Sequence, residues 1–349
     1  MAKVVLNEDV TTSRTSDPRA AGSPPPSARL RPLDLSILIV TWNSERWIGR
    51  CLRAIPAACE GLDYEVLVHD NASKDATVAH VGDARLIRSS YNAGFAAGTN
   101  SAFAASSGRY VFLLNPDCEL APRALTTLFD FLEQHPNAAA AAPLLLDEDG
   151  GSDQREFQLR RLPSLATLMA EVLLIDKLFP KNATTARYRY RDLDLTEPRR
   201  IEQPAAAALL LRRDVVDEIG PLDEQFAPAW FEDVDYCRRL AEKNKEIWVV
   251  PEAQATHVGG VSLEHIRFAA FVDVWYRNMW RYGRKWLRPA QAEALRWAII
   301  VGMLLRCAAA GLAGLRPRGI KRWDAFRAYA NVLRKAFERW SPDSSLSSS

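Results

Sequence analysis

Hydrophobic residues gather in short runs along the first half of the chain, separated by segments with helical spacing. Residues 35–40, 64–68 and 110–114 are runs of this kind, and 85–88 is a shorter one. Continuous apolar runs are typical of parallel strands covered on both faces, because strands with one face in water alternate instead. The pattern therefore predicts an α/β fold with a doubly wound, mostly parallel sheet and helices on both faces.

The second half of the chain continues this pattern after an interruption. A helix is predicted after Pro122, and apolar residues follow at 138–146, 205–211 and 247–250. We expect these runs to extend the same sheet rather than to form a second one. Residues from about 150 to 200 are mixed and Arg-rich, and their pattern predicts the weakest organisation in the globular part.

Composition divides the chain into four segments. The first is rich in Pro, Ser, Ala and Arg without the apolar stretch of a signal peptide, which is typical of a disordered tail. We expect a disordered tail at 1–33, the α/β domain at 34–265, a basic and amphipathic helical extension at 266–340, and a disordered tail at 341–349.

The charge balance and the cysteines narrow the function. Of the 349 residues, 45 are Lys or Arg and 43 are Asp or Glu, so no strongly basic surface favours nucleic acid as a partner. The five cysteines are scattered and lack the spacing of a zinc site. They indicate reduced thiols and a cytoplasmic setting.

The C-terminal extension contains one long apolar stretch, although none reaches the roughly 18 residues that span a membrane. Residues 298–305 are apolar, the stretch resumes at 307–315, and arginines and lysines flank it. It predicts either peripheral contact with an anionic membrane surface or a buried helix with a solvated basic flank. Residues 275–286 interleave aromatic and basic side chains, which favours the acceptor side of a cleft or a lipid surface.

Candidate ligand-binding residues follow the predicted strands. Asn115-Pro116-Asp117 comes directly after the strand at 110–114, so Asp117 emerges at a carboxyl end, where open α/β sheets bind ligands. A carboxylate there can hold a metal, although a simple turn is the alternative.

Thr41 and Asp70 end two further strands at the same edge, with Asn92 and Gly94 expected nearby. Asp70 is either a nucleotide ligand or the start of an Asx-turn or helix cap. Gly94 and Gly98 either let the backbone approach a ligand or belong to a tightly packed Ala- and Gly-rich helix.

Three acidic residues, Glu232, Asp233 and Asp235, lie in the first turn of a helix predicted at 230–240. Carboxylates are favoured there by the helix dipole, and Asp235 can pair with Arg239 one turn later. Asp233 lies off the apolar stripe of this helix, so we expect it to face the cleft.

Together these segments resemble the family 2 glycosyltransferases with the GT-A fold, over roughly residues 35–282. The rhamnosyltransferase-like branch is the most similar, because NPD stands where other members carry DxD. The resemblance rests on SILIVTWNSERWIGRCLRAI (36–55), EVLVHDNASKDAT (65–77), NAGFAAGTNSAFAASSGRYVFLLNPD (92–117), and FEDVDYCRRL (231–240) followed by HVGG (257–260).

The resemblance implies a nucleotide-sugar donor, dTDP- or UDP-linked, and a Mg²⁺ or Mn²⁺ ion. Asp117 matches the last carboxylate of DxD, which holds that metal, and His257 is a candidate further ligand or else a structural histidine. Asn115 replaces a carboxylate, which weakens the expected metal affinity. The donor-binding candidates are Thr41, Asp70, Asn92, Gly94 and Asn115.

The family assigns the part of general base to the position of Asp233. An inverting transfer needs one base to deprotonate the acceptor hydroxyl as it attacks the anomeric carbon. Glu232 and Trp230 are the acceptor-binding candidates, with a core role as the alternative for Trp230. We expect transfer of a sugar, L-rhamnose being one candidate, to a glycan or lipid-linked acceptor at the inner face of the membrane.

Two other functions stay open at this point. One is a catalytically idle GT-A module that binds nucleotide-sugars or scaffolds an assembly. The other is a nucleotidyltransferase, which would carry a Gly-rich, basic triphosphate loop after the first strand. Thr41-Trp42-Asn43-Ser44 is not such a loop.

Overall fold

The structure of the protein is a computed structural model that describes residues 33–179, 181–260, 266–310 and 319–340. The tails expected at 1–33 and 341–349 lie outside the described residues, apart from Leu33. Within the described residues no helix is both long enough and apolar enough to cross a membrane.

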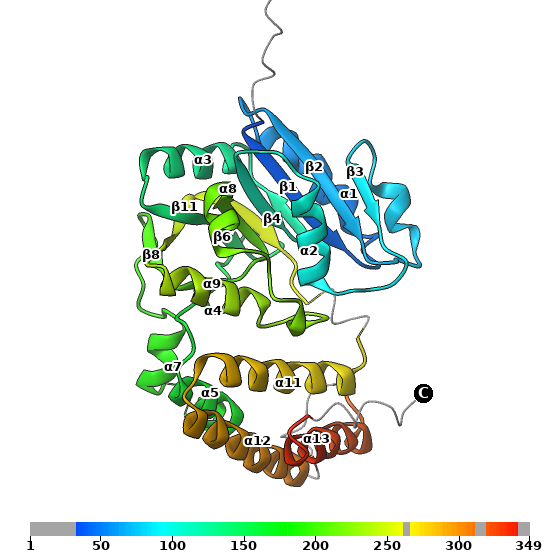
Figure 1. Cartoon of the computed structure of the whole chain (residues 1–349), viewed down its shortest axis with the longest axis vertical. Coiled ribbons are helices and arrows are strands. Elements are labelled where there is room, and N and C mark those ends of the chain that lie inside the picture. The colour runs from blue at the N-terminus through cyan, green and yellow to red at the C-terminus, as the bar shows by residue number, and fades with distance from the viewer. Residues whose placement is uncertain (1–32, 180, 261–265, 311–318, 341–349) are drawn as a thin grey trace, which may run out of the picture. The chain divides into compact units, whose positions relative to one another are not determined.

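A mixed sheet forms the centre of the α/β part, in the order β3-β2-β1-β4-β10-β6-β11-β5, with β8 pairing to β11. From β3 to β4 all pairs are parallel, and so is the pair β6 and β11, whereas β10 runs antiparallel to both its neighbours. The predicted doubly wound, mostly parallel sheet is confirmed (Figure 1). Its strands are β1 (Leu35–Thr41), β2 (Tyr64–Asp70), β3 (Arg85–Arg88), β4 (Tyr110–Leu114), β5 (Cys118–Leu120), β6 (Ala138–Leu146), β8 (Arg199–Ile201), β10 (Ala208–Arg212) and β11 (Glu246–His257).

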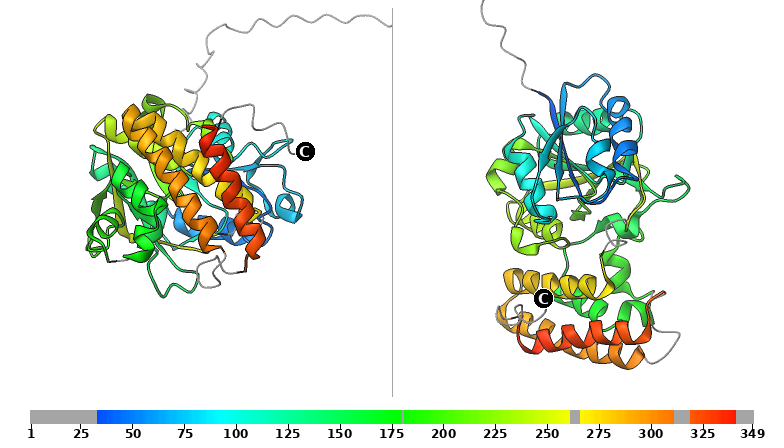
Figure 2. Two further views of the ribbon diagram at one scale, coloured as in Figure 1. Left: turned by 90° about the horizontal axis from the view of Figure 1, so that it is seen from below. Right: turned by 90° about the vertical axis from the view of Figure 1, so that its right-hand side faces the viewer.

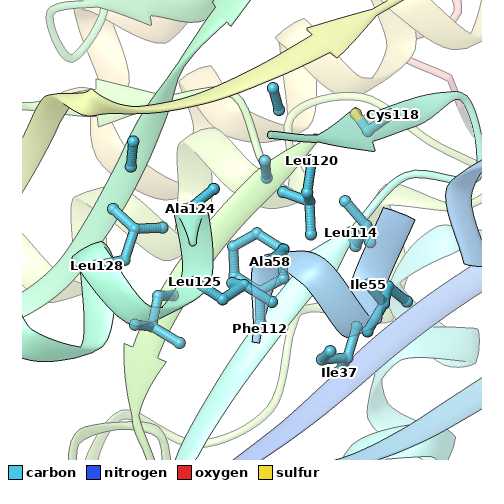
Figure 3. Packing of buried hydrophobic residues seen from close by; sticks show 14 of the residues in the cluster. Ile37, Ile55, Ala58, Phe112, Leu114, Cys118, Leu120, Ala124, Leu125 and Leu128 are labelled. Atoms are coloured by element: carbon cyan, nitrogen blue, oxygen red, sulfur yellow. The ribbon is translucent and has the colours of Figure 1, made fainter. Parts of the chain in front are cut away.

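Helices cover both faces of this sheet, because successive strand residues point to opposite sides. Ile37 and Phe112 face α1 (Ile48–Ala58) and α3 (Ala124–Gln134), and Figure 3 shows this core around Phe112. Leu38 and Val111 face the other side, where α2 (Phe95–Ala104), α8 (Arg213–Ile219) and α9 (Glu232–Glu242) pack. Short 3₁₀ helices lie at η1 (Ala76–His80) and η2 (Glu224–Phe226).

Residues 150–200 are better organised than their sequence pattern predicted. The short strand β7 (Leu159–Arg160) pairs antiparallel with β9 (Gln203–Pro204), apart from the main sheet. Ser164 caps α5 (Leu165–Val172) with a reciprocal capping box to Thr167. The other helices of this segment are α4 (Arg155–Gln158), α6 (Ile175–Leu178) and α7 (Ala183–Tyr188).

The C-terminal helices are present as expected. They are α11 (Phe268–Trp286), α12 (Pro289–Ala309) and α13 (Arg322–Phe337), and they run side by side in Figure 2. Their apolar faces share a core with α5 and with Phe231 and Val234 at the start of α9. The helical extension is therefore packed against the segment that carries the candidate base.

Candidate active site

A cavity of about 700 Å³ opens at the carboxyl ends of β1 and β4. Its walls come from these strand ends, the loop before α2, the residues before β10, and the starts of α9 and α11. Every site residue predicted from the sequence lines it except Asp70, which is buried and is not among the lining residues. The lining candidates are Thr41, Asn92, Gly94, Asn115, Asp117, Trp230, Glu232, Asp233 and His257.

Thr41 and Asp70 lie side by side, as predicted, because they pair in the parallel register of β1 and β2. Asp70 is 1% exposed, and its Oδ2 accepts a hydrogen bond from the backbone N–H of Ser73 at 3.2 Å. Its Oδ1 is buried without a hydrogen-bond partner among the described residues. One oxygen of the Asp70 carboxylate therefore stabilises the turn, and the other is available to accept a hydrogen bond.

Gly94 is explained by a contact within the protein. Its φ is +94°, and an added Cβ would lie 2.6 Å from the carbonyl oxygen of Pro228. That oxygen accepts the N–H of Phe95 at 2.7 Å. In α2, a Cβ on Gly98 would lie 2.8 Å from Val40, which fits the tightly packed helix rather than a ligand approach. Gly94 thus joins the loop before α2 to the segment that precedes α9.

Asp117 and His257 meet at one edge of the cavity, as candidates for a metal site. The Nε2 of His257 lies 3.6 Å from Oδ2 of Asp117, and both side chains are buried. Gln154 donates through Nε2 to the His257 carbonyl at 2.7 Å and to Asp147 at 3.1 Å, which fixes the orientation of its amide. Its Oε1 then accepts from Nδ1 of His257 at 2.9 Å, leaving Nε2 without a proton.

This arrangement fits a divalent cation. Burial lowers the pKa of His257 against the opposing charge of Asp117, so the neutral ring presents a lone pair to a carboxylate. Two acceptors that face each other favour a positive charge between them, and a histidine held at Nδ1 by a carbonyl is typical of metal ligands. Oδ2 of Asp117 also accepts the backbone N–H of Gly259 at 3.2 Å. Cys118 also lies close, but burial and Asp117 raise the pKa of its thiol well above the usual value, and Sγ contacts the Ala207 carbonyl.

Glu232 and Asp233 begin α9 on the opposite wall of the cavity. Burial and the charge of Asp233 raise the pKa of Glu232 well above its usual value, which favours a neutral carboxyl. Burial also raises the pKa of Asp233, while the N–H groups of Val234 and Ala206 and the charge of Arg160 lower it. Adjacent carboxyls in different protonation states can serve as hydrogen-bond donor and as base.

The segment before α9 is held in an unusual conformation. Trp230 and Phe231 have φ of +71° and +75°, which costs free energy for residues with a Cβ. Asn278 in α11 is fully buried and donates through Nδ2 to the carbonyls of Ala229 and Trp230 at 2.9 and 3.1 Å, and to that of Phe226 at 2.6 Å. α11 therefore fixes the backbone that aims Glu232 and Asp233.

Asp235 anchors α9 itself to α11. Its side chain is completely buried, and its Oδ1 accepts from Nε1 of Trp286 at 2.8 Å. Lys285 Nζ lies 2.8 Å from the same oxygen, and the predicted pair with Arg239 is present at 3.1 Å. The third acid of this helix start is thus structural, whereas Asp233 faces the cavity as predicted.

Several cavity residues were missed by the sequence interpretation. Trp230 packs edge-on against Phe271 at 4.9 Å, so it belongs to an aromatic wall as well as lining the cavity. The Nε1 of Trp275 donates to Glu171 in α5 at 3.1 Å. Most missed residues come from the poorly patterned segment and from the start of α11, where no motif marked them: Phe157, Arg160, Leu168, Glu171, Tyr188, Gln203 and Phe271. Trp275 also lines the cavity, and it begins the stretch 275–286 that was expected at a cleft or at a lipid surface.

Comparisons with known proteins identify a family and a relative. The family model described as Glycosyl transferase family 2 matches residues 36–220. An N-acetylglucosaminyl-diphospho-decaprenol L-rhamnosyltransferase from Mycobacterium tuberculosis is 28% identical over 238 residues, which are 64% of this chain and 75% of the relative.

Two solved structures share the fold. The mannosyltransferase PcManGT from Pyrobaculum calidifontis, in complex with GDP-Man and Mn²⁺, has a TM-score of 0.52 at 15% identity and covers 89% of each chain. GalNAc-T7 with UDP, GalNAc and Mn²⁺ has a TM-score of 0.53 at 15% identity, covering 88% of this chain and 56% of that one. The GT-A fold predicted from the sequence is therefore confirmed.

Proposed function

Because this chain belongs to glycosyl transferase family 2 and is a glycosyltransferase, we propose that it transfers a sugar with inversion from a nucleotide-diphosphate donor to an acceptor hydroxyl. One observation carries the proposal: Asp233 shares a single cavity with the facing acceptors of Asp117 and His257. L-rhamnose is the proposed sugar, since the relative is named as an L-rhamnosyltransferase.

On the donor side, we propose that the nucleotide lies against the ends of β1 and β2. The buried Oδ1 of Asp70 lacks a partner among the described residues, which supports its role as acceptor for the imide N–H of uracil or thymine. Because this oxygen is buried and Asp70 does not line the cavity, the proposal requires a small movement of the neighbouring turn on binding. Thr41, Asn92, Gly94 and Asn115 line the same end of the cavity as donor contacts.

Asp117 and Nε2 of His257 would hold the divalent metal, Mg²⁺ or Mn²⁺. When bound, the ion neutralises charge on the donor diphosphate and stabilises the departing nucleoside diphosphate. Gln154 orients His257 for this role through the Nδ1 contact at 2.9 Å. Asn115 contributes a neutral amide where other members carry a carboxylate.

Asp233 is the proposed general base. Its carboxylate takes the proton from the acceptor hydroxyl while that oxygen forms the new bond to the anomeric carbon and the diphosphate leaves from the opposite face. Glu232, kept neutral by burial, donates a hydrogen bond to the acceptor. The Trp230 ring offers an apolar face against which a sugar ring packs.

A panel of dTDP-, UDP- and GDP-sugars, assayed for binding and turnover with and without Mn²⁺, tests this function. We expect one donor to bind more tightly with Mn²⁺ and to be consumed when a glycan or polyprenyl-diphosphate-sugar acceptor is added. Binding without turnover across all acceptors would instead support the idle module. Unchanged donor affinity after Asp117→Ala, with Mn²⁺ present, would remove Asp117 from the metal site.

We also propose that α12 and α13, within the segment 266–340, contact the cytoplasmic face of a membrane. The exposed face of α12 carries Trp297, Val301, Leu304 and Leu305, at helical spacing. On α13, Phe337 contacts Trp297 with ring centres 6.2 Å apart, so both helices contribute to one apolar surface. Arg322 and Arg327 are exposed on α13 and suit anionic headgroups.

Sedimentation with vesicles tests this contact. The protein should sediment with phosphatidylglycerol vesicles and less with phosphatidylcholine vesicles, and Leu304→Asp should release it. A protein that stays in the supernatant with both vesicles would contradict the membrane proposal.

A further inference from the structure

β7 and β9 bring a cation and a carboxamide to the cavity wall. In their antiparallel pairing Arg160 lies opposite Gln203. Side chains directly opposite one another in such a pair project from the same face. Both residues line the cavity that contains Asp233. A strand pair outside the main sheet therefore presents two polar groups beside the proposed base.

Gln203 contacts the base directly. Its Nε2 lies 3.4 Å from Oδ2 of Asp233 and 3.1 Å from the carbonyl of Pro204, and the side chain is almost completely buried. The other oxygen, Oδ1, accepts the N–H of Val234 at 2.8 Å. Both oxygens of Asp233 are thus held, one by α9 itself and one by β9.

Arg160 has a charge that the rest of the protein does not neutralise directly. Among the described residues no carboxylate lies within ion-pair distance of it, and its buried Nε has no hydrogen-bond partner. Its guanidinium lies 6.0 Å from the ring centre of Tyr188, another cavity residue. Burying a guanidinium group without a partner costs free energy, unless its charge interacts with a neighbouring anion or with a ligand.

The Arg160 charge acts on two carboxyls of the cavity, because burial raises the pKa of Glu171 and that of Asp233 and this charge lowers both. Glu171 also accepts the Nε1 hydrogen bond of Trp275, whereas Asp233 is the carboxyl that Gln203 contacts.

On α9, burial and the charge of Asp233 raise the pKa of Glu232 well above its usual value, and burial raises that of the Cys237 thiol. β9 contributes an amide, and Lys285 of α11 pairs with Asp235. Among the groups that act on Asp233, Arg160 supplies the positive charge that opposes the effect of burial.

We propose that Arg160 is a positioning residue for Asp233, which together with Gln203 holds the carboxylate oriented and ionised for proton abstraction. The proposal rests on the function given above. It assigns a role in the reaction to the segment 150–200, whose sequence pattern gave no sign of one.

The test combines a pH profile with a direct titration of Asp233. In Arg160→Gln, the acid limb of the pH profile of kcat/KM should move to higher pH by about one unit. At pH values below this limb, kcat/KM should therefore fall by about tenfold. The ¹³C signal of the Asp233 carboxyl, assigned by its absence in Asp233→Asn, should titrate with the same displacement. Arg160→Lys keeps the charge and should restore most of both.

Arg161→Gln is the matched control. Arg161 is the next residue along the chain, but it is partly exposed and pairs with Glu202 at 2.7 Å, outside the cavity. Its removal should leave the acid limb and the titration in place. An Asp233 titration that is unchanged in Arg160→Gln would overturn the proposal, whatever happens to activity. Normal activity of Asp233→Asn would overturn only the base assignment, because the titration in Arg160→Gln is measured independently.

Discussion

The two sides of the cavity are built in different ways. On the proposed donor side, Thr41, Asp70 and Asp117 stand at the carboxyl ends of neighbouring strands or just after them, so the sheet topology alone brings them together. On the proposed acceptor side, Asp233 and Arg160 come from a helix start and a two-residue strand. The comparison teaches that the donor side depends on backbone register, whereas the acceptor side depends on buried polar contacts.

The contact at Gly94 is where the two sides meet. Pro228, in the segment held by α11, accepts the N–H that begins α2 on the donor side. A change in the acceptor-side clamp should therefore reach the donor loop, whereas a change in α1 or α3 should not. The variants that follow probe this asymmetry.

Breaking the anchor of α9 should have the largest effect. Asp235→Ala leaves Lys285 and Arg239 without their buried partner, so we expect a loss of about 3–5 kcal/mol in the free energy of unfolding. Urea denaturation measures this loss. Glu242→Ala is the control, because it removes an exposed pair with Arg238 and should cost less than about 1 kcal/mol. Equal losses in the two variants would contradict the anchor.

Removing the clamp from α11 should have the next largest effect. Asn278→Ala leaves the carbonyls of Ala229 and Trp230 without their donor, at a cost of about 1–3 kcal/mol. Ala229 and Trp230 come just before the proposed base, Asp233. We therefore expect kcat to fall even at temperatures at which the variant is fully folded. Asn331→Ala, on the partly exposed part of α13, is the control. Full activity in folded Asn278→Ala would show that the clamp does not position the base.

The donor side could be predicted closely from the sequence. Apolar runs located β1, β2 and β4 to within a residue or two, and strand ends then placed Thr41 and Asp117 at one edge. The reason is physical, because a buried parallel strand leaves a continuous apolar pattern and its end is the ligand edge. Gly94 was expected to let the backbone approach a ligand, but nothing in the sequence indicated its contact with Pro228. That contact joins residues more than a hundred positions apart.

The other side of the cavity could be predicted only at α9 and at Trp275, the first residue of the aromatic and basic stretch 275–286. Asp233 was found because its helix is amphipathic, but Arg160 and Gln203 meet it through a pairing of two residues on each strand. Such short strands have no periodicity to detect. Asn278 was hidden for another reason, because it is a polar residue in a helix whose aromatic and basic neighbours dominate the pattern.

A substitution at the junction of the two sides should have a smaller effect. In Gly94→Ala, the new Cβ meets the Pro228 carbonyl in addition to the strain of a positive φ. Gly220→Ala is the matched control, because φ is +84° there and nothing lies within 4 Å of an added Cβ. We expect Gly94→Ala to be less stable than the control by about 1–3 kcal/mol and to bind donor more weakly. Similar thermal unfolding of both variants would argue against a tight junction.

The smallest effect is expected at the metal site. Gln154→Leu removes the group that orients His257, so Mn²⁺ affinity should fall by about 10- to 100-fold while the ligands remain. Electron paramagnetic resonance of free Mn²⁺ measures the affinity. Gln291→Leu, at the start of α12, is the control and should bind Mn²⁺ normally. Wild-type affinity in Gln154→Leu would leave His257 as a structural histidine.

The central claim is that one cavity binds the donor on one side and deprotonates the acceptor on the other. Asp233→Asn tests it most directly, because the amide keeps the shape of the side chain and cannot take a proton. We predict that the donor dissociation constant with Mn²⁺ stays within about twofold, while transfer falls by about 10²- to 10⁴-fold. Transfer at a near-normal rate with unchanged donor binding would contradict the account.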